Sequence, residues 1–313
     1  MKHPRIGVIG LGGQSAFLSA ERLPSPGQTV SCNDLFFELG GKGYNQAIAC
    51  ARMGVDTVFV GAVGNDAYGE ACAAELRENG ITACLVKKNV PTAFATITTA
   101  QNAENTVAVF PGAAKALTPE DLRTPYVMDE LKQCTCLLLQ NEIARPCLEE
   151  ACRIGKELGI PVYLNPAPAE GLSWDILKKC QLITPNYGEA LQLAEFTAKD
   201  ILDGETLAKI FKKKGIARAV ITMGAQGALL MEQDEVKMIP SFSFEVSVDT
   251  TGAGDTFNGY LVGGLVSGMS LYEAACLATV AAGISVTRHG AAGSIPFMAE
   301  VNSNYQKAKQ FFK

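Results

Sequence analysis

The chain has 313 residues, of which 48% are hydrophobic and 19% are charged, a balance typical of a folded globule with a full apolar core. Its net charge of −5 argues against nucleic acid or an anionic membrane as the main partner, although a small anion could still bind at a local site. The sequence contains no run of about 18 uncharged apolar residues, so no membrane span is expected.

Short apolar strands alternate with helical segments along the chain, which predicts an α/β fold with a mostly parallel sheet and helices on both faces. Glycines that follow helical segments, such as Gly54 and Gly80, mark where those helices should end. The expected strands are 5–10, 57–60, 137–140, 162–165, 182–184 and 219–222, and the expected early helices are 45–53 and 68–79.

Two regions, about 11–39 and 90–112, break this rhythm with β-prone alternation, as in TAFATITTA and NTVAVF. They predict a small second sheet inserted into the α/β domain. Because such a sheet has no core of its own, we expect it to act as a lid over a cleft. With no repeat, linker or low-complexity tract, the chain is expected to form one domain over residues 1–313.

The ten cysteines are scattered, and the N-terminus lacks the apolar core of a secretory signal, which predicts reduced thiols and a cytoplasmic location. Cys134, Cys136, Cys147 and Cys152 could suggest a metal site. However, Cys136 opens an apolar run and two of the four fall on an expected helix. Structural zinc sites usually show tighter paired spacings, so zinc is not expected.

The stretch VDTTGAGDTFNGY, residues 248–260, leads through small residues into a helix. A helix start presents backbone N–H groups without internal partners and carries the positive end of the helix dipole, which favours an anion. Gly252, Ala253 and Gly254 would let an anion approach the backbone closely. Asp255 follows directly.

A carboxylate at a helix N-terminus is held in its charged form and is a weak base toward an ordinary alcohol. It suits phosphoryl transfer through a loose transition state, in which the alcohol gives up its proton late. In this interpretation the glycine loop stabilises charge on the phosphoryl oxygens and Asp255 accepts the proton. The alternative is that Asp255 only caps the helix.

A second glycine-rich turn, ELGGKGYNQA at 38–47, also opens a helix and carries Lys42 and Asn45. It is not a Walker A loop, because Gly43 stands where Ser or Thr would hold magnesium. The segment GLGGQS after the first strand is not a dinucleotide fingerprint either, because Ser15 replaces the last glycine. Dinucleotide binding therefore becomes a weak competitor.

The segments GGKGYNQAIACARMG and DTTGAGDTFNGYLVGGL, about 200 residues apart, closely resemble the two signatures of the PfkB carbohydrate kinases, in particular the ribokinase-like branch. LPSPGQTV, LNPAPA, TPNYGEA, ITMGAQGAL and VTRHGAAGSIP extend the resemblance over nearly the whole chain. It implies a ribokinase-like fold, a sugar kinase activity that depends on ATP, Mg²⁺ and K⁺, and a homodimer formed through the lid.

Carried over position by position, the resemblance assigns the site. Asp255 would be the catalytic base and Gly252, Ala253 and Gly254 the anion hole. The sugar side would comprise Gly41, Lys42, Asn45 and Glu142, and the nucleotide side Asn186, Glu189, Thr222, Gly224 and Gly227. Glu189 would organise Mg²⁺ through water, while Asp249, the backbone around Thr251 and segment 285–294 would form the K⁺ site.

Simpler interpretations of these positions stay open. Glu189 could be an ordinary helix residue, TMGAQG a hairpin turn, and Asp249 a turn cap. His3 and His289 are the only histidines, so a histidine-based triad or zinc hydrolase is excluded.

The sequence departs from the ribokinase pattern after the first strand. Ribokinases carry an Asn-x-Asp pair that contacts the sugar hydroxyls, and Gly13 and Ser15 stand at those positions. Losing a charge-assisted hydrogen bond costs roughly 1.5–3 kcal/mol in binding. Ribose is therefore doubtful as the substrate; Gln14 or Ser15 could bind a less hydroxylated one, Phe17 could add an apolar wall, and Glu142 could partly compensate.

The function expected from the sequence is ATP-dependent phosphorylation of a hydroxymethyl group on a sugar or sugar-like molecule. A nucleoside or pseudouridine-type kinase is the close alternative, and a catalytically idle regulator that binds a metabolite is the alternative from another class. Nucleic acid and membranes are not expected as partners.

Overall fold

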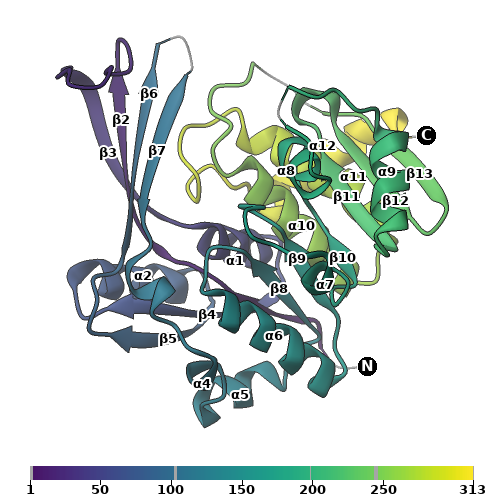
Figure 1. The fold of residues 1–313 in the computed structure, drawn as a ribbon, viewed down its shortest axis with the longest axis horizontal. Coiled ribbons are helices and arrows are strands. Elements are labelled where there is room, and N and C mark those ends of the chain that lie inside the picture. The colour runs from purple at the N-terminus through teal and green to yellow at the C-terminus, as the bar shows by residue number, and fades with distance from the viewer. Residues whose placement is uncertain (1–2, 102–103, 198, 243–245, 313) are drawn as a thin grey trace.

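The computed structural model describes residues 3–101, 104–197, 199–242 and 246–312. Asn102 and Ala103, inside the expected lid segment, lie outside the described residues. In the described part of the chain, one nine-stranded sheet forms the body and one four-stranded sheet stands apart from it (Figure 1).

The large sheet has the order β13-β12-β11-β10-β9-β8-β1-β4-β5. Pairing is parallel from β5 through β11, and the last hairpin adds β12 and β13 antiparallel at one edge. The strands are β1 (Arg5–Ile9), β4 (Asp56–Gly64), β5 (Thr82–Lys88), β8 (Cys136–Gln140), β9 (Val162–Asn165), β10 (Leu182–Ile183), β11 (Arg218–Thr222), β12 (Ala228–Glu232) and β13 (Glu235–Ile239).

Helices cover both faces of this sheet, and each face has its own apolar core. Strands buried on both sides read as continuous apolar runs, as CLLLQ does in β8. One face is covered by α1 (Lys42–Arg52), α2 (Ala67–Glu78), α10 (Ala253–Val266), α11 (Leu271–Ser285) and α12 (Met298–Ala308). The other is covered by α4 (Pro119–Leu122), α5 (Pro125–Leu131), α6 (Arg145–Leu158), α7 (Trp174–Leu177), α8 (Tyr187–Leu193) and α9 (Gly204–Lys213).

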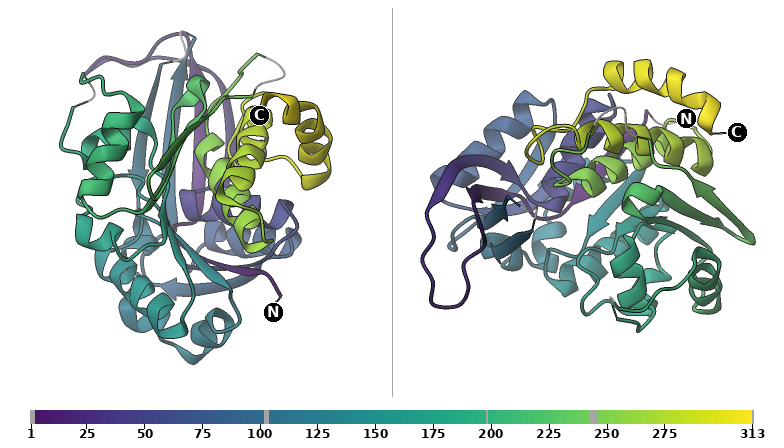
Figure 2. Two further views of the ribbon diagram at one scale, coloured as in Figure 1. Left: turned by 90° about the vertical axis from the view of Figure 1, so that its right-hand side faces the viewer. Right: turned by 90° about the horizontal axis from the view of Figure 1, so that it is seen from above.

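The small sheet has the order β3-β2-β6-β7, and we call it the lid. Its strands are β2 (Gly13–Ala20), β3 (Cys32–Gly40), β6 (Ala93–Ala100) and β7 (Asn105–Phe110). Both edge strands, β3 and β7, carry exposed large apolar side chains, among them Phe37 and Val107. Figure 2 shows the loop between β2 and β3, in purple, projecting from the lid away from the body.

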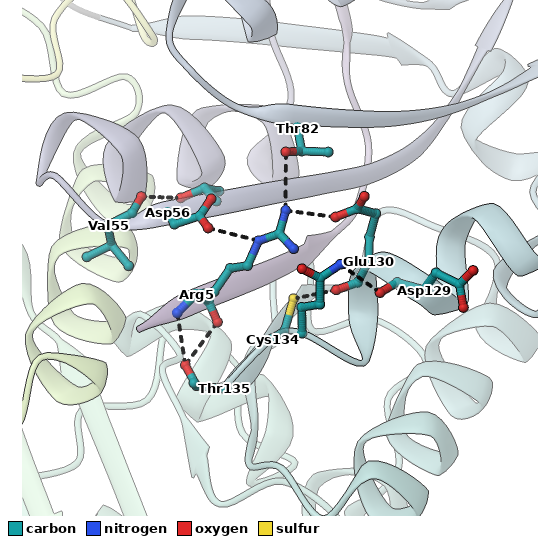
Figure 3. A network of polar contacts seen from close by, with 10 residues as sticks. Arg5, Val55, Asp56, Thr82, Asp129, Glu130, Cys134 and Thr135 are labelled. Carbon is teal, nitrogen blue, oxygen red and sulfur yellow. Dashed lines mark hydrogen bonds and ion pairs between the residues drawn. The ribbon is translucent and has the colours of Figure 1, made fainter. Parts of the chain in front are cut away.

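Arg5 connects several elements at the end of the large sheet where the parallel strands begin (Figure 3). Its guanidinium contacts Asp56 Oδ2 at 3.0 Å, Glu130 Oε2 at 2.7 Å and Thr82 Oγ1 at 3.3 Å. Its backbone N–H also donates to Thr135 Oγ1 at 3.1 Å. One side chain on β1 thus ties together β4, β5 and α5 at the sheet edge where the parallel strands begin.

The expected mostly parallel sheet, with helices on both faces and a separate small sheet, is confirmed. Several boundaries differ. The helix expected at 45–53 begins earlier, at Lys42, and the strand expected at 57–60 runs over Asp56–Gly64. No described helix combines the length and apolar character that a membrane crossing would need.

Candidate active site

Five loops meet where the parallel strands end, which is the usual position of a ligand site in an open α/β sheet. They follow β1, β8, β9, β10 and β11, and they carry Glu142, Asn186 and Gly224 among the residues singled out in the sequence. The start of α10 and the start of α1 lie at the same end of the sheet, because hydrogen bonds described below join Asp255 to α1.

The start of α1 depends on glycines. Gly41, the residue before the helix, has φ 110°, a backbone region that favours glycine. A Cβ on Gly43 would lie 2.7 Å from Gly10 Cα, so the helix can approach the end of β1 only because both positions are glycine. This close approach brings Lys42, Asn45 and Gln46 into the site.

Asp255 is 7% exposed and lies in the first turn of α10. Asn45 Nδ2 donates to its Oδ2 and Gln46 Nε2 to its Oδ1, each at 2.9 Å. Burial raises the pKa of Asp255, while Lys42 and the two amides act in the opposite direction. The side chain is therefore more than a helix cap, since both of its oxygens face amide donors from α1.

Gln46 is a site residue that the sequence analysis did not single out. Its Nε2 also donates to Asn165 Oδ1 at 3.1 Å, and its Oε1 accepts from Gln140 Nε2 at 2.6 Å. An ionised carboxylate only accepts hydrogen bonds, so Asp255 fixes the orientation of the Gln46 amide and, through it, that of Gln140. The signal in the sequence was the dipeptide Asn-Gln directly after the glycine-rich turn.

The same reasoning fixes Asn45. Because its Nδ2 faces Asp255, its Oδ1 points the other way, where this buried oxygen has no hydrogen-bond partner among the described residues. A Cβ on Gly40, which lines the cavity described below, would lie 3.7 Å from this oxygen. A buried acceptor without a partner costs free energy, so this oxygen is suited to a ligand hydroxyl.

Lys42 carries the positive charge of the site. Burial alone would lower its pKa, but Asp255, Glu142 and Glu189 outweigh this effect and raise it. The pKa of Glu142 is raised by burial to about 7, although Lys42 and a 2.8 Å hydrogen bond from the Lys42 backbone N–H oppose the rise. The Lys42 ammonium group thus interacts electrostatically with three acids: Glu142 on the sugar side, the proposed base Asp255, and Glu189 on the nucleotide side.

Of the expected glycine loop Gly252–Gly254, Gly252 is the residue before α10, and Ala253 and Gly254 are already the first two residues of the helix. Gly252 has φ 73° and packs against Ala291, whereas a Cβ on Gly254 would meet no atom within 4 Å. The Ala253 N–H is directed weakly to Thr250 O at 3.3 Å, so it is not wholly free, in contrast to the sequence-based expectation for this amide. The open side of the loop is the side of Gly254, next to Asp255.

A cavity of about 50 Å³ lies where the lid meets the residue before α1 and the loop after β8. Gly13, Ser15 and Glu142, which the sequence analysis assigned to the sugar side, line it, whereas Lys42 and Asn45 do not. Gln14 lines it too, and its amide donates to the backbone of Ser15 and Glu38. The rest of its wall is largely apolar or glycine, from Leu11, Gly40, Gly41, Ala93, Phe94, Ala95 and Val109. Phe17 does not line it; its ring stacks on Phe36 within the lid.

Gly13 is required by packing. A Cβ there would lie 2.2 Å from the backbone oxygen of Ala93, its register partner on β6. The missing side chain therefore opens no extra room for a ligand, because the β6 backbone already fills that direction. Ser15 alone can present a side chain from this pair of positions.

On the nucleotide side, Asn186 and Glu189 form a reciprocal cap at the start of α8. Asn186 Oδ1 accepts from the Glu189 N–H, and Glu189 Oε2 accepts from the Asn186 N–H, each at 2.8 Å. Asn186 also bridges to Thr222 at the end of β11. Burial raises the pKa of Glu189, whereas Lys42 opposes the rise, so this acid belongs electrostatically to the site.

The segment TMGAQG is the turn of the β11–β12 hairpin, so its simpler interpretation is correct as far as the fold goes. Its two glycines differ. A Cβ on Gly227 would lie 2.0 Å from Ile239 O, which makes that glycine structural, whereas Gly224 faces open space. Gly224 is therefore the position at which a ligand could approach the backbone.

Asp249 joins the glycine loop to segment 285–294. Its carboxylate accepts from the Thr251 N–H at 2.9 Å and from the Gly290 N–H at 3.0 Å. The sequence analysis placed these same segments together around a monovalent cation. Both contacts are with backbone N–H donors, and the role of Asp249 at a cation stays a prediction.

Cavity size alone does not locate the site. A larger depression of about 520 Å³ lies near α7 and the end of α8. None of the residues discussed above lines it.

The comparisons with known proteins agree with this geometry. The model of the pfkB family carbohydrate kinases matches residues 13–298. A ribokinase of Haemophilus influenzae is 34% identical over 295 residues, covering 94% of this chain and 95% of its own, and a deoxyribokinase of Salmonella typhi is 32% identical over 302, covering 95% and 97%. The structure of Arabidopsis thaliana ribokinase complexed with ribose and ATP matches with a TM-score of 0.84 at 26% identity, covering 98% and 99%.

Proposed function

The chain belongs to the pfkB family of carbohydrate kinases, and from this premise we propose that it transfers the γ-phosphoryl group of ATP to a hydroxymethyl group of a small, sparingly hydroxylated sugar. That it is a sugar kinase follows from the family. The identity of the sugar and the roles of individual residues are the proposal.

The proposed mechanism assigns one role to each part of the site. The sugar lies in the lid cavity with its hydroxymethyl oxygen at Asp255, which accepts the proton late in the reaction. The amides of Gly252–Gly254 and the Lys42 ammonium stabilise the charge on the phosphoryl oxygens. The lid keeps water out, so that the sugar and not water is the acceptor.

One observation carries the proposal: Asp255 is buried with each carboxylate oxygen held by an amide, beside an open glycine loop. A helix cap needs no such shell. A base that must be held at one point for in-line attack does, because misplacement of a reacting group by about 1 Å can cost about 10²-fold in rate.

The cavity supports a sparingly hydroxylated sugar. Most of its wall is apolar or glycine, so it offers few hydrogen-bond partners to sugar hydroxyls. Glu142 supplies a carboxylate to its wall, while Gly13 and Ser15 supply none. The unpartnered Asn45 Oδ1 does not line the cavity but lies 3.7 Å from where a Cβ on Gly40 would be. A deoxypentose fits this pattern better than ribose does.

The residues also suit the two cations that the family implies. Mg²⁺, which neutralises the phosphates when bound, would be organised by Glu189 and Asn186 through water, since each of these side chains already uses one oxygen in the helix cap. K⁺ would be held near Asp249 and would fix the backbone of the glycine loop. The lid edges support a homodimer, and a cytoplasmic location stays a prediction.

The deciding experiment measures ADP formation from Mg-ATP with deoxypentoses, pentoses, hexoses, ketoses, sugar acids and nucleosides. We expect the highest kcat/KM with a deoxypentose and a lower value with ribose. Turnover only with nucleosides would replace the substrate proposal with the nucleoside kinase. Tight binding of one compound without any turnover would favour the regulator.

A further inference from the structure

The carboxylate of Glu38, at the base of the lid, binds the loop after α11, which packs against the glycine loop. Glu38, near the end of β3, accepts hydrogen bonds from the backbone N–H of Ala291 at 2.6 Å and from that of Gly293. Figures 1 and 2 show the loop after α11, in yellow, turned toward the lid. Two N–H groups on one charged acceptor make a stronger tie than neutral hydrogen bonds do.

The loop is shaped to this contact. A Cβ on Gly290 or on Gly293 would lie 2.9 Å from a carboxylate oxygen of Glu38. Gly290 also has φ 91°, which favours glycine. A side chain at either position would push the carboxylate away, so both glycines serve the approach of Glu38.

Glu38 does not line the sugar cavity, but its backbone is bonded to residues that do. It pairs in register with Ser15 on β2, and its carbonyl accepts from the Gln14 side chain at 3.1 Å. Gly40 and Gly41, which follow shortly after it, line the cavity themselves. A sugar that orders this wall therefore orders Glu38.

On its far side the same loop backs the proposed anion hole. A Cβ on Gly252 would lie only 3.0 Å from Ala291 Cα, so Ala291 lies directly against the first glycine. Arg52, at the end of α1, donates to the carbonyls of Ala292 and Ile295, each at 2.7 Å. Arg52 thus binds the carbonyl groups of the loop, and Glu38 binds its N–H groups.

We propose that Glu38 is a positioning residue that couples occupancy of the sugar cavity to the geometry of the phosphoryl-binding glycines. Arg52 fastens the loop to the body, and Glu38 fastens it to the lid. When a sugar steadies β2 and β3, the loop is held against Gly252 and the glycine loop takes its working shape. This inference rests on the proposed function in taking Gly252–Gly254 as the loop that receives the phosphoryl group.

The test compares Glu38→Ala and Glu38→Gln with the wild type and with Asp34→Asn. Asp34 is an exposed acid on the same strand whose carboxylate accepts only from its neighbour Leu35 among the contacts found, so it is a matched control. Each protein is assayed for ADP formation from Mg-ATP, first without sugar and then with D-ribose or 2-deoxy-D-ribose, whichever gives the higher wild-type kcat/KM. Melting temperatures are recorded in parallel.

For Glu38→Ala we expect kcat with saturating sugar to fall roughly 5- to 50-fold, because the coupling between two sites is typically of this size. The sugar-free rate and the KM for Mg-ATP should change by less than about twofold, since neither depends on the lid contact. Glu38→Gln keeps one acceptor oxygen and should recover part of the loss. Asp34→Asn should match the wild type.

A wild-type kcat in Glu38→Ala would overturn the proposal. So would an equal loss of the sugar-stimulated and sugar-free rates, because that pattern indicates general damage. If the alanine variant does not fold, Glu38→Gln decides by the same ratio of rates. Failure of the proposed function would appear separately, as a wild-type protein that no sugar stimulates.

Discussion

At the scale of single residues, Asp255 balances burial against hydrogen bonding. Removal from water favours its neutral form, while Lys42, Asn45 and Gln46 favour its charged form. A proton acceptor needs this balance, because a carboxyl group that was simply buried would already be protonated. Its charge is maintained by side chains from α1, a different part of the chain.

Asp255→Asn removes the proton acceptor without changing the shape of the side chain. We expect kcat to fall by about 10²–10⁴. The melting temperature should change little, because the loss of a buried charge is offset by the hydrogen bond that is lost when the new NH2 group faces one of the two amide donors. Steady-state kinetics and a thermal melt check this, and a near-normal kcat would contradict the role of base.

Gln46→Leu removes one donor to Asp255 and should raise the pKa of that carboxyl group further. Because the base must be ionised, the acidic limb of the profile of kcat/KM against pH should move up by about one unit. Activity lost on this limb of the profile should return at higher pH. Gln133→Leu, at an exposed glutamine, is the control, and an unshifted limb would show that Gln46 does not support the base.

Glu142→Gln tests a second buried acid. The folded-state pKa is raised from 4.5 to about 7, so the folded chain holds more protons than the unfolded chain within this window. The free energy of unfolding of the wild type should therefore fall as pH rises from about 4.5 through 7. Because Glu142 keeps some exposure to the cavity, we expect the variant to lack roughly 1–2 kcal/mol of this fall. Urea unfolding at pH 5 and pH 8 measures the difference.

The site residues differ in how far the sequence could reveal them. Asp255, Lys42 and Asn45 stand beside glycine-rich turns, where local chemistry and family resemblance point together. Gln46 and Gln140 were not foreseen, because the role of an inward-facing amide depends on contacts between residues 94 positions apart. Only the folded chain shows that these amides orient each other.

At the scale of elements, the alternation of strands and helices could be predicted from the sequence, because strands that are buried on both faces form apolar runs. Element ends were less readable. Helix α1 starts at Lys42 because Gly43 packs on Gly10, a long-range contact that the apolar periodicity does not contain. The extra length of β4 was missed because it ends in small residues, Gly61 to Gly64, that resemble a loop.

Gly43→Ala tests whether α1 needs this close contact. The new Cβ would lie 2.7 Å from Gly10 Cα, which is backbone and yields little, so the helix start must move. We expect a loss of about 1–3 kcal/mol in stability, and about a 10²-fold loss in kcat/KM from displacement of Lys42 and Asn45. Thermal melts and kinetics measure both, and wild-type values would show that the helix start adapts.

At the scale of the whole molecule, the lid stands out from the body with two open edges. Unpaired strand edges with apolar side chains invite pairing with another chain. Leu35, Phe37, Val107 and Val109 are each at least half exposed on the edge strands. We expect a second copy of this chain to cover them.

Sedimentation should therefore give about twice the chain mass of 33.1 kDa. Phe37→Asp should shift the equilibrium toward the monomer, because it places a charge at the apolar edge. Ile201→Asp, at an exposed apolar residue outside the lid, is the control. A monomeric wild type, or a dimer unaffected by Phe37→Asp, would contradict assembly through the lid.

The contact between Gly13 and the Ala93 carbonyl sets a limit on how sugar preference can change. An enzyme engineer could install a carboxylate at Ser15 by one codon change, but any larger residue at Gly13 would first require respacing two hydrogen-bonded strands. A side chain that binds a vicinal diol can thus be introduced at position 15 but not at position 13. Substrate selectivity at position 13 therefore depends on the spacing between the backbones of β2 and β6, which a single substitution does not change.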